Sequence, residues 1–328
     1  MDHFGTLSDG RPVHRAVIAN AHLRVAVLDF GAILQDVRLA GEDLPRTLGF
    51  PDVAPYEALR GLFGPVIAPV ANRIAGARAE IAGHSHRLEA NEGDNTLHSG
   101  GAGTQHKIWD LVDERPDAVG FALDLPDGEG GFPGNRRIAV TYRLRDAALE
   151  VEITARTDAE TLMNVTQHAF WTAQSPEDWA GQTLTIHADS YLPVTAETLP
   201  TGEVAPVAGT SFDFRTPRRL DPAALPPIDH NFCLSPARGA LRPAVRLAAP
   251  GGAWMTIETT APGMQLFDLS GFGISETGLH GFPYPRRAAI AFEPQDWPDA
   301  PGRPGWPDIT LRPDARFRQV TRYTFGRG

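Results

Sequence analysis

The sequence of 328 residues lacks several features, and each absence excludes a class of protein. It has a single cysteine, Cys233, so it can form no internal disulfide and no cysteine-based zinc site. Lys and Arg number 30 against 40 Asp and Glu, and the formal charge of −10 argues against nucleic acid as a partner. No apolar run approaches the roughly 18 residues that a membrane span needs, so no membrane partner is expected.

The first residues, MDHFGTLSDGRP, also lack the basic stretch followed by an apolar one that a secretory signal would need. Together with the single thiol, this favours an unexported protein in the reducing cytoplasm. A hydrophobic content of 42% and a charged content of 21% are those of an ordinary folded chain.

What the chain does have is frequent turns and period-two patterns. Its 33 glycines and 29 prolines suit short strands better than long helices. Two hairpins are predicted. The first runs through Ile138, Val140, Tyr142 and Leu144, turns at 145–148, and returns through Leu149, Val151 and Ile153; the second runs through Val245 and Leu247, turns at 250–252, and returns through 254–257.

Further strands are expected at Leu23–Asp29, Leu184–Ala188, Ala288–Phe292 and Phe317–Phe325. One short helix is expected at Ala54–Arg60, directly after Pro51-Asp52. No linker, charge block or repeat divides the chain. The sequence therefore predicts an all-β fold, with one antiparallel domain over residues 1–328 that is either a sandwich or a distorted barrel.

The stretch VTQHAFW, residues 165–171, places a histidine in the middle of a strand-like run. Side chains two apart share a face of a strand, so His168 and Phe170 should point the same way, and an aromatic ring beside a histidine suits a sugar. A lone histidine of this kind is more often a core residue whose ring nitrogens bond to the backbone. Chemistry at His168 therefore needs support from other residues.

That support comes from polar residues placed where a plain core would not have them. Glu293 follows an apolar run and precedes a proline, which suggests a half-buried carboxylate at a strand end with a raised pKa. Asp229 lies between Pro226-Pro227 and an apolar segment, Arg73 lies among small apolar residues, and His98 precedes a glycine-rich loop. Together they supply an acid, a base and several groups that can bind hydroxyls.

A metal site is not expected. His84 and His86 lie two apart in AGHSHRL, but no third ligand is near them in sequence, so an exposed turn is the better interpretation.

The ordered series of short motifs resembles the aldose 1-epimerase, or galactose mutarotase, family over nearly the whole chain. The matching pieces are Ala71-Asn72-Arg73-Ile74, Asn95-Thr96-Leu97-His98, Thr166-Gln167-His168, Asp229-His230-Asn231-Phe232, Gly263-Met264-Gln265 and Glu293 with Gln295. The resemblance implies a large antiparallel β-supersandwich.

It also implies roles for the residues that match. His168 would protonate the ring oxygen of a monosaccharide, and Glu293 would take the proton from the anomeric hydroxyl. His98 would be a second group at the ring oxygen, and the remaining polar residues would bind hydroxyls: Asn72, Arg73, Asp229 and Gln265. No metal or organic cofactor is implied. The protein would be a monomer or a homodimer.

Three other functions remain open at this stage. A glycoside hydrolase would pair two carboxylates, whereas the best acid here is a histidine. A non-catalytic sugar-binding protein would not need both His168 and Glu293. An epimerase of phosphorylated hexoses would need a basic cluster at the pocket mouth, for which Arg218-Arg219 and Arg286-Arg287 are candidates.

Overall fold

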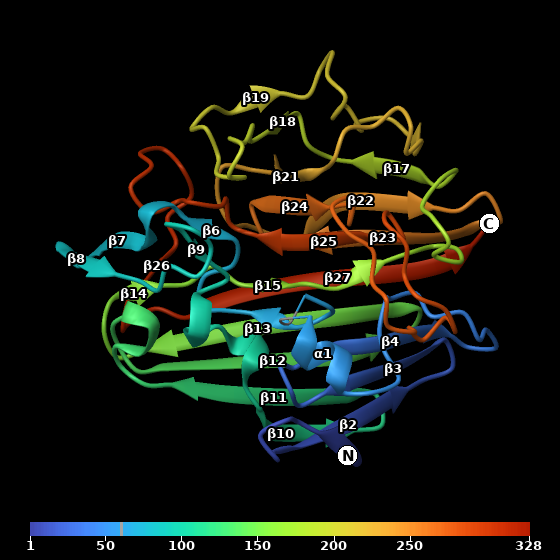
Figure 1. The fold of residues 1–328 in the computed structure, drawn as a ribbon, viewed down its shortest axis with the longest axis horizontal. Helices are drawn as coiled ribbons and strands as arrows, with labels where there is room; N and C mark the ends of the chain where they lie inside the picture. Colours follow the sequence, from blue (N-terminus) through green and yellow to red (C-terminus); the bar gives the residue numbers. More distant parts are fainter. Residues whose placement is uncertain (60–61) are drawn as a thin grey trace.

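The computed structural model describes residues 1–59 and 62–328, and strands dominate it. Every strand pair in these residues is antiparallel, as the alternating sequence pattern predicts. In Figure 1 the N-terminal strands lie at the bottom of the view, and the strands of residues 190–233 lie at the top. The predicted antiparallel β fold is confirmed.

The largest sheet has nine strands in the order β10 (Asp110–Arg115), β11 (Ala118–Leu125), β12 (Arg136–Arg145), β13 (Ala148–Thr157), β27 (Phe317–Arg327), β23 (Ala253–Thr259), β22 (Arg242–Ala248), β17 (Thr183–Ile186) and β20 (Arg218–Arg219). A six-stranded sheet has the order β16 (Phe170–Trp171), β25 (Ile290–Gln295), β24 (Gly263–Phe267), β21 (Asp229–Cys233), β18 (Ser190–Tyr191) and β19 (Ala205–Pro206). The N-terminal sheet consists of β1 (Asp2–Thr6), β2 (Pro12–Ala19), β3 (Leu23–Leu28) and β4 (Leu34–Leu39).

Four two-stranded pairs complete the strands. They are β14 (Thr161–Leu162) with β26 (Thr310–Leu311), β15 (Thr166–Gln167) with β5 (Val66–Ile67), β6 (Arg73–Ile74) with β9 (Thr96–Leu97), and β7 (Arg78–Ile81) with β8 (His84–Arg87). The helical segments are short: α1 (Ala54–Ala58) and the 3-10 turns η1 (Ala75–Ala77), η2 (Gly100–Ala102), η3 (Thr104–His106) and η4 (Glu129–Gly131).

The first predicted hairpin is confirmed as β12 and β13. Its alternating apolar residues are all buried, and Asp146 makes the tight turn with a left-handed φ of 50°, which Asp tolerates better than most residues. The second predicted hairpin is confirmed as β22 and β23. One apolar core joins side chains from all three sheets, such as Val25, Tyr142 and Phe292.

Several predicted strand and helix boundaries differ from those in the structure. Strand β3 ends at Leu28, β17 covers Thr183–Ile186, and β27 continues to Arg327. The predicted helix ends at Ala58 in the described chain, and Arg60 lies outside the described residues. His84 and His86 lie on strand β8 and not in a turn, because the segment pairs with β7.

The largest correction concerns the predicted strand Ala288–Phe292. Strand β25 begins at Ile290 and runs to Gln295, so Glu293 lies inside the strand and not at its end. A proline usually ends a strand, but Pro294 pairs with Met264 of β24 and the pairing continues beyond it. Glu293 is also more buried than expected, with 2% of its surface exposed.

Candidate active site

The site is built on one face of the six-stranded sheet. Asn231, Gln265 and Glu293 are direct cross-strand partners on β21, β24 and β25, so their side chains form a row on the same face. Two residues along, a second row on this face contains Asp229, Phe267, Ala291 and Phe170. Gly263 makes room for the first row, because a Cβ there would lie 2.5 Å from Asn231 Oδ1.

His168 lies between β15 and β16, beside this face. Its backbone is held by hydrogen bonds from His168 N to Pro65 O and from Gly64 N to His168 O, both 2.8 Å. Its Nε2 lies 3.4 Å from Glu293 Oε1, and its ring is 5.7 Å from the Phe170 ring. The prediction that His168 and Phe170 point the same way is therefore confirmed, although the chain between them is not a continuous strand. Phe170 is fully buried behind His168.

Burial dominates the electrostatics of the His168–Glu293 pair. It lowers the pKa of His168 to about 4, against the smaller opposing effect of backbone groups at His168 and Leu62. Burial also raises the pKa of Glu293 well above its usual range; Asp229 adds to this effect and Arg73 opposes it. Glu293 Oε2 has no hydrogen-bond partner among the described residues. The expected direction of the Glu293 shift is confirmed.

A second histidine borders the pair. His98 follows β9, and its ring lies 5.5 Å from the His168 ring. Its Nδ1 accepts a hydrogen bond of 3.0 Å from the backbone N–H of Asn72. Burial, then the charges of His168 and Arg73, lower the pKa of His98 well below its usual value. The ring is therefore neutral near pH 7, and the hydrogen lies on Nε2 because Nδ1 is an acceptor.

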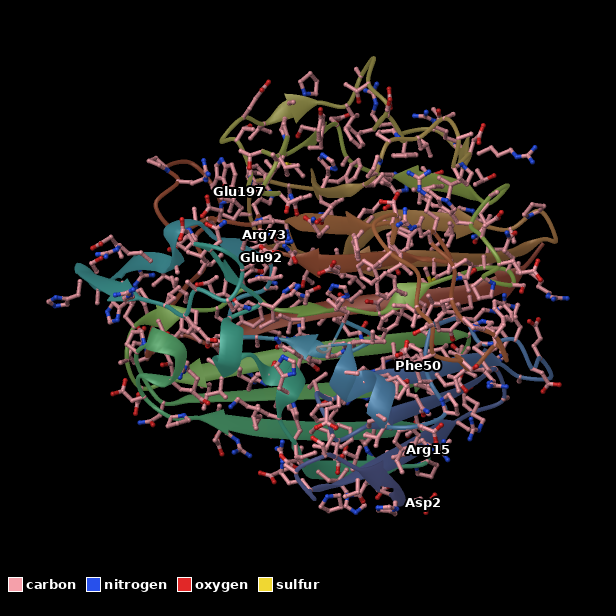
Figure 2. All side chains as sticks on the ribbon, in the orientation of Figure 1. Asp2, Arg15, Phe50, Arg73, Glu92 and Glu197 are labelled. Atoms are coloured by element: carbon pink, nitrogen blue, oxygen red, sulfur yellow. The ribbon has the colours of Figure 1, made fainter. Side chains whose placement is uncertain are left out.

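Strand pairing brings Arg73 to the same place, since Arg73 on β6 pairs with Leu97, the residue before His98. The Arg73 guanidinium makes a bidentate ion pair with Glu92, at 2.6 and 2.9 Å (Figure 2). It also lies 3.7 Å from Asp229 Oδ2. Asp229 Oδ1 in turn accepts a hydrogen bond of 2.6 Å from Gln265 Nε2. These groups form one polar wall beside Glu293.

A cavity of about 550 Å³ borders the site at His98, which is one of its lining residues. Apolar residues form part of its lining, Leu59, Leu62 and Leu97, and two carboxylates also border it, Glu89 and Glu92. Glu92 belongs to both the polar wall and this cavity, so the partly apolar opening adjoins the wall.

The structure brings together the residues that the sequence singled out. These are His168, Glu293, Asn72, Arg73, His98, Phe170, Asp229 and Gln265, all linked through the contacts above. Two neighbours were missed: Asn231, which period two would have placed on the face of Asp229, and Glu92, which nothing in the sequence connects with Arg73.

Metal ligands do not cluster in the described part of the chain. Across residues 1–59 and 62–328, no three His, Cys, Asp or Glu side chains lie close enough together to hold a metal ion. Within the same residues, no helix has the length and apolar character needed to cross a membrane.

Comparison with known proteins gives one consistent result. Residues 14–324 match the family model described as aldose 1-epimerase. Human galactose mutarotase is 33% identical over 332 residues, which cover 98% of this chain and 97% of that protein. The aldose 1-epimerase of Escherichia coli is 32% identical over 335 residues, which cover 97% of this chain and 96% of that protein.

Solved structures agree with the sequence comparison. A GalM/aldose epimerase homologue from C. elegans superposes with a TM-score of 0.89 at 27% identity, covering 96% of this chain and 99% of that one. Galactose 1-epimerase from Lactobacillus acidophilus gives a TM-score of 0.83 at 28% identity, covering 98% and 97%. The fold is therefore that of the galactose mutarotases, and the chain belongs to the aldose 1-epimerase family.

Proposed function

We propose that the protein is an isomerase that interconverts the α and β anomers of a free aldose, such as galactose or glucose. The observation that carries this proposal is the buried contact of 3.4 Å between His168 Nε2 and Glu293 Oε1, beside a wall of hydroxyl-binding groups. A general acid and a general base at this separation can act on the two neighbouring oxygens of one hemiacetal carbon.

In this mechanism the sugar lies with its ring oxygen at His168 and its anomeric hydroxyl at Glu293. Arg73, Asp229 and Gln265 bind the hydroxyls farther around the ring, with Asn231 beside them on the same sheet face. Asn72 Oδ1 accepts a hydrogen bond from the Arg73 backbone N–H at 2.9 Å, and the Asn72 backbone carbonyl accepts one from the His98 backbone N–H. Phe170 supports the His168 ring from behind.

Ring opening moves two protons. His168, in its protonated form, donates a proton to the ring oxygen as the bond from that oxygen to the anomeric carbon breaks, and Glu293 accepts the proton of the anomeric hydroxyl. The products are the open-chain aldehyde, a neutral imidazole and a carboxylic acid. Rotation about the bond between the first and second carbons, then closure on the other carbonyl face, gives the opposite anomer.

The shifted pKa values match one stage of this cycle. Because burial favours the neutral form of each group, the free site holds its proton on Glu293 and leaves His168 neutral. This is the protonation state of the open-chain stage. Moving the proton from Glu293 to His168 prepares the pair to open a ring, and the charge of Arg73 favours the ionised carboxylate. The 3.4 Å contact is longer than an ordinary hydrogen bond, as catalytic contacts often are without substrate.

Phosphorylated hexoses are a weaker alternative, because two of the four candidate arginines, Arg218 and Arg287, are engaged elsewhere. The Arg287 guanidinium contacts Asp268 and donates to the carbonyls of Pro222 and Leu225. Arg218 lies over the Phe214 ring and donates to Ser211 O. The opening beside His98 is bordered by the carboxylates Glu89 and Glu92, which would repel a phosphate.

A sugar-binding protein without catalysis is also disfavoured. Buried polar groups that only bind are normally satisfied by hydrogen bonds, whereas the two ionisable groups of the site meet each other and Glu293 Oε2 stays without a partner among the described residues. A free carboxylate oxygen beside a histidine suits proton transfer better than storage of a ligand.

We further propose that residues 1–328 act as one domain in the cytoplasm, as a monomer or a homodimer. Apolar side chains from three sheets share one core, which favours a single folding unit. The lone cysteine, Cys233, is buried and suits a reducing compartment.

Polarimetry tests the activity directly. Freshly dissolved α anomers of galactose, glucose, xylose and arabinose, and the 6-phosphates of the hexoses, are followed with and without the protein. We expect faster relaxation with at least one free aldose and the same rate after dialysis against a chelator. No acceleration with any free aldose, or activity that returns only with a divalent ion, would refute the proposal.

A further inference from the structure

Three of the chain segments that carry the site meet behind it. Asn72 and Arg73 follow the loop of residues 68–71, His168 follows residues 164–167, and Glu293 lies on β25, just before Pro294–Asp296. Two buried side-chain amides, Asn164 and Gln319, join these segments behind the site, and we call this pair the amide clasp.

Asn164 is the residue where the segments meet. Its backbone N–H donates to Pro69 O at 2.8 Å, and its carbonyl accepts from the Ala71 N–H at 2.7 Å, which holds the chain leading to Asn72. Its side chain bonds twice to the backbone of Asp296, three residues after Glu293: Oδ1 accepts from the Asp296 N–H at 2.8 Å, and Nδ2 donates to Asp296 O at 3.2 Å.

Gln319 on β27 makes a second link between the acid and the base segments. Its Nε2 donates both to Val165 O, at 3.3 Å, and to Pro294 O, at 2.8 Å. Pro294 adjoins Glu293 in sequence, and Val165 lies three residues before His168. Arg238 closes the network, because it donates to Gln319 Oε1 at 2.8 Å and pairs with Asp296.

We propose that Asn164 and Gln319 are positioning residues that set the separation of His168 and Glu293. This inference rests on the proposed function, because the separation matters only if the pair transfers protons. Neither amide belongs to the polar wall of the site, and both are 1 to 2% exposed. Apart from the bond between Gln319 and Arg238, their side-chain bonds go to backbone groups, so they define where the two chain segments lie relative to each other.

The physical reason is the precision that proton transfer requires. A misplacement of about 1 Å can lower a rate about 100-fold, even when the change lies away from the reacting groups. Sheet pairing joins the histidine segment to β25 only after His168, where Phe170 and Trp171 pair with Ala291 and Ile290. Before His168, β15 contains only Thr166 and Gln167, and its partner is β5, not β25. The clasp adds side-chain hydrogen bonds that link the chain before His168 to Pro294 and Asp296, which follow Glu293.

The test uses Gln319→Met and Asn164→Leu, which keep volume and remove the hydrogen bonds. Gln319→Met is the more robust variant, because only the side chain of Gln319 takes part in the clasp. Gln182→Met is the matched control: Gln182 is a buried amide that accepts a hydrogen bond from the Ala173 N–H at 2.9 Å, and it lies outside the clasp. All three are compared by thermal stability, kcat, KM and the pH profile of kcat, alone and combined with Glu293→Gln.

We expect the clasp variants to lower kcat about tenfold or more, to leave KM within about twofold, and to shift the pH profile, whereas Gln182→Met changes only stability. In the Glu293→Gln background the loss from Gln319→Met should shrink to about twofold. A Gln319→Met protein with the kcat and pH profile of the parent, or an equal loss in both backgrounds, would overturn the inference.

An activity-independent readout separates this inference from the proposed function. The ring nitrogen resonances of His168 in the NMR spectrum report its contact with Glu293 without any turnover. They should move in Gln319→Met and stay in place in Gln182→Met. If the parent protein proves inactive, unchanged His168 resonances in Gln319→Met still contradict the clasp, and shifted ones still support it.

Discussion

Two glutamates inside antiparallel strands have opposite environments. Glu150 on β13 has Arg143 and Arg322 as its cross-strand partners, and it lies 3.1 Å from the Arg322 guanidinium and 3.4 Å from Arg145. Glu293 on β25 pairs across the strand with Gln265 and faces His168. The side chain of Glu150 is 12% exposed, and that of Glu293 is 2% exposed.

The difference appears in their proton affinities. Burial acts to raise the pKa of Glu150, but the hydrogen bonds and charges of Arg322 and Arg145 outweigh it, so the pKa is lowered. At Glu293, burial acts with less opposition, and the pKa is raised. The same residue type on the same kind of strand thus favours the ionised form in one sheet and holds its proton more tightly in the other. The neighbours decide the role, and the secondary structure does not.

The substitution Glu293→Gln is the strongest test of this difference between the two glutamates. The substitution keeps the size of the side chain and removes its proton affinity, so we expect kcat to fall about 100- to 10,000-fold. The free energy of unfolding should stay the same or rise, because a buried carboxyl is replaced by a neutral amide. Polarimetric kinetics and chemical denaturation of one preparation measure both. Near-normal turnover would show that Glu293 is not the base.

His168→Gln tests the other member of the pair. We expect kcat to fall about 100-fold with the fold intact, because a general acid is lost and no large cavity is created. The double variant with Glu293→Gln should lose less than the product of the single losses, since the two residues act as one unit. A His168→Gln protein that is less stable yet fully active would identify His168 as a core histidine.

Arg73→Ala and Asp229→Ala test the polar wall. Each removes a charged hydrogen-bonding group, which costs about 1.5 to 3 kcal/mol, so KM should rise roughly 10- to 150-fold while kcat changes less. Initial rates over a range of sugar concentrations give both constants. An unchanged KM in both variants would exclude these residues as hydroxyl binders.

The pH dependence of stability tests the burial of His168, the partner of Glu293. Burial lowers the pKa of His168 to about 4 in the folded protein, against the ordinary 6.5 of histidine, so the unfolded chain binds the proton more readily. Its contribution to stability is complete above pH 6.5 and is lost as the pH falls toward 4. Wild type should therefore lose about 2 kcal/mol more than His168→Gln between pH 7 and pH 4.5. Equal losses in urea denaturation would contradict the buried neutral ring.

Glu150→Gln should have the smallest effect. Its ion pairs lie at the surface, so the expected loss is about 1 kcal/mol or less, and it should shrink in high salt. The kcat should not change. A large loss of activity in this variant would mean that the two glutamates are not as different as their surroundings indicate.

Local patterns in the sequence predict much of the fold but less of the site. The hairpin of β12 and β13 follows from alternation alone, because each of its apolar residues has a place in the core. The extent of β25 could not be read locally, because Pro294 resembles a strand end until its pairing with Met264 is known. The burial of Glu293 likewise depends on neighbouring strands that lie far away in sequence.

The same dependence on distant strands explains which site residues the sequence did not predict. The ion pair of Arg73 with Glu92 depends on how β6 and β9 bring their loops together, and no spacing encodes that arrangement. Asn231 could have been found, because it lies two residues after Asp229 on a strand. The roles of His168 and Glu293 came from the family resemblance, and their adjacency needed the structure.

The near-complete enclosure of the His168–Glu293 pair has a consequence for how the site exchanges with water. During the proposed cycle the two side chains together hold one proton before opening, in the open-chain stage and after closure. The net charge of the enclosed region therefore stays constant, and no ion has to cross the protein to reset the enzyme. Such an electroneutral cycle is compatible with a dry, low-dielectric setting in which any stage with a different net charge would be strongly disfavoured. The catalyst can then return to its starting form as soon as the sugar closes.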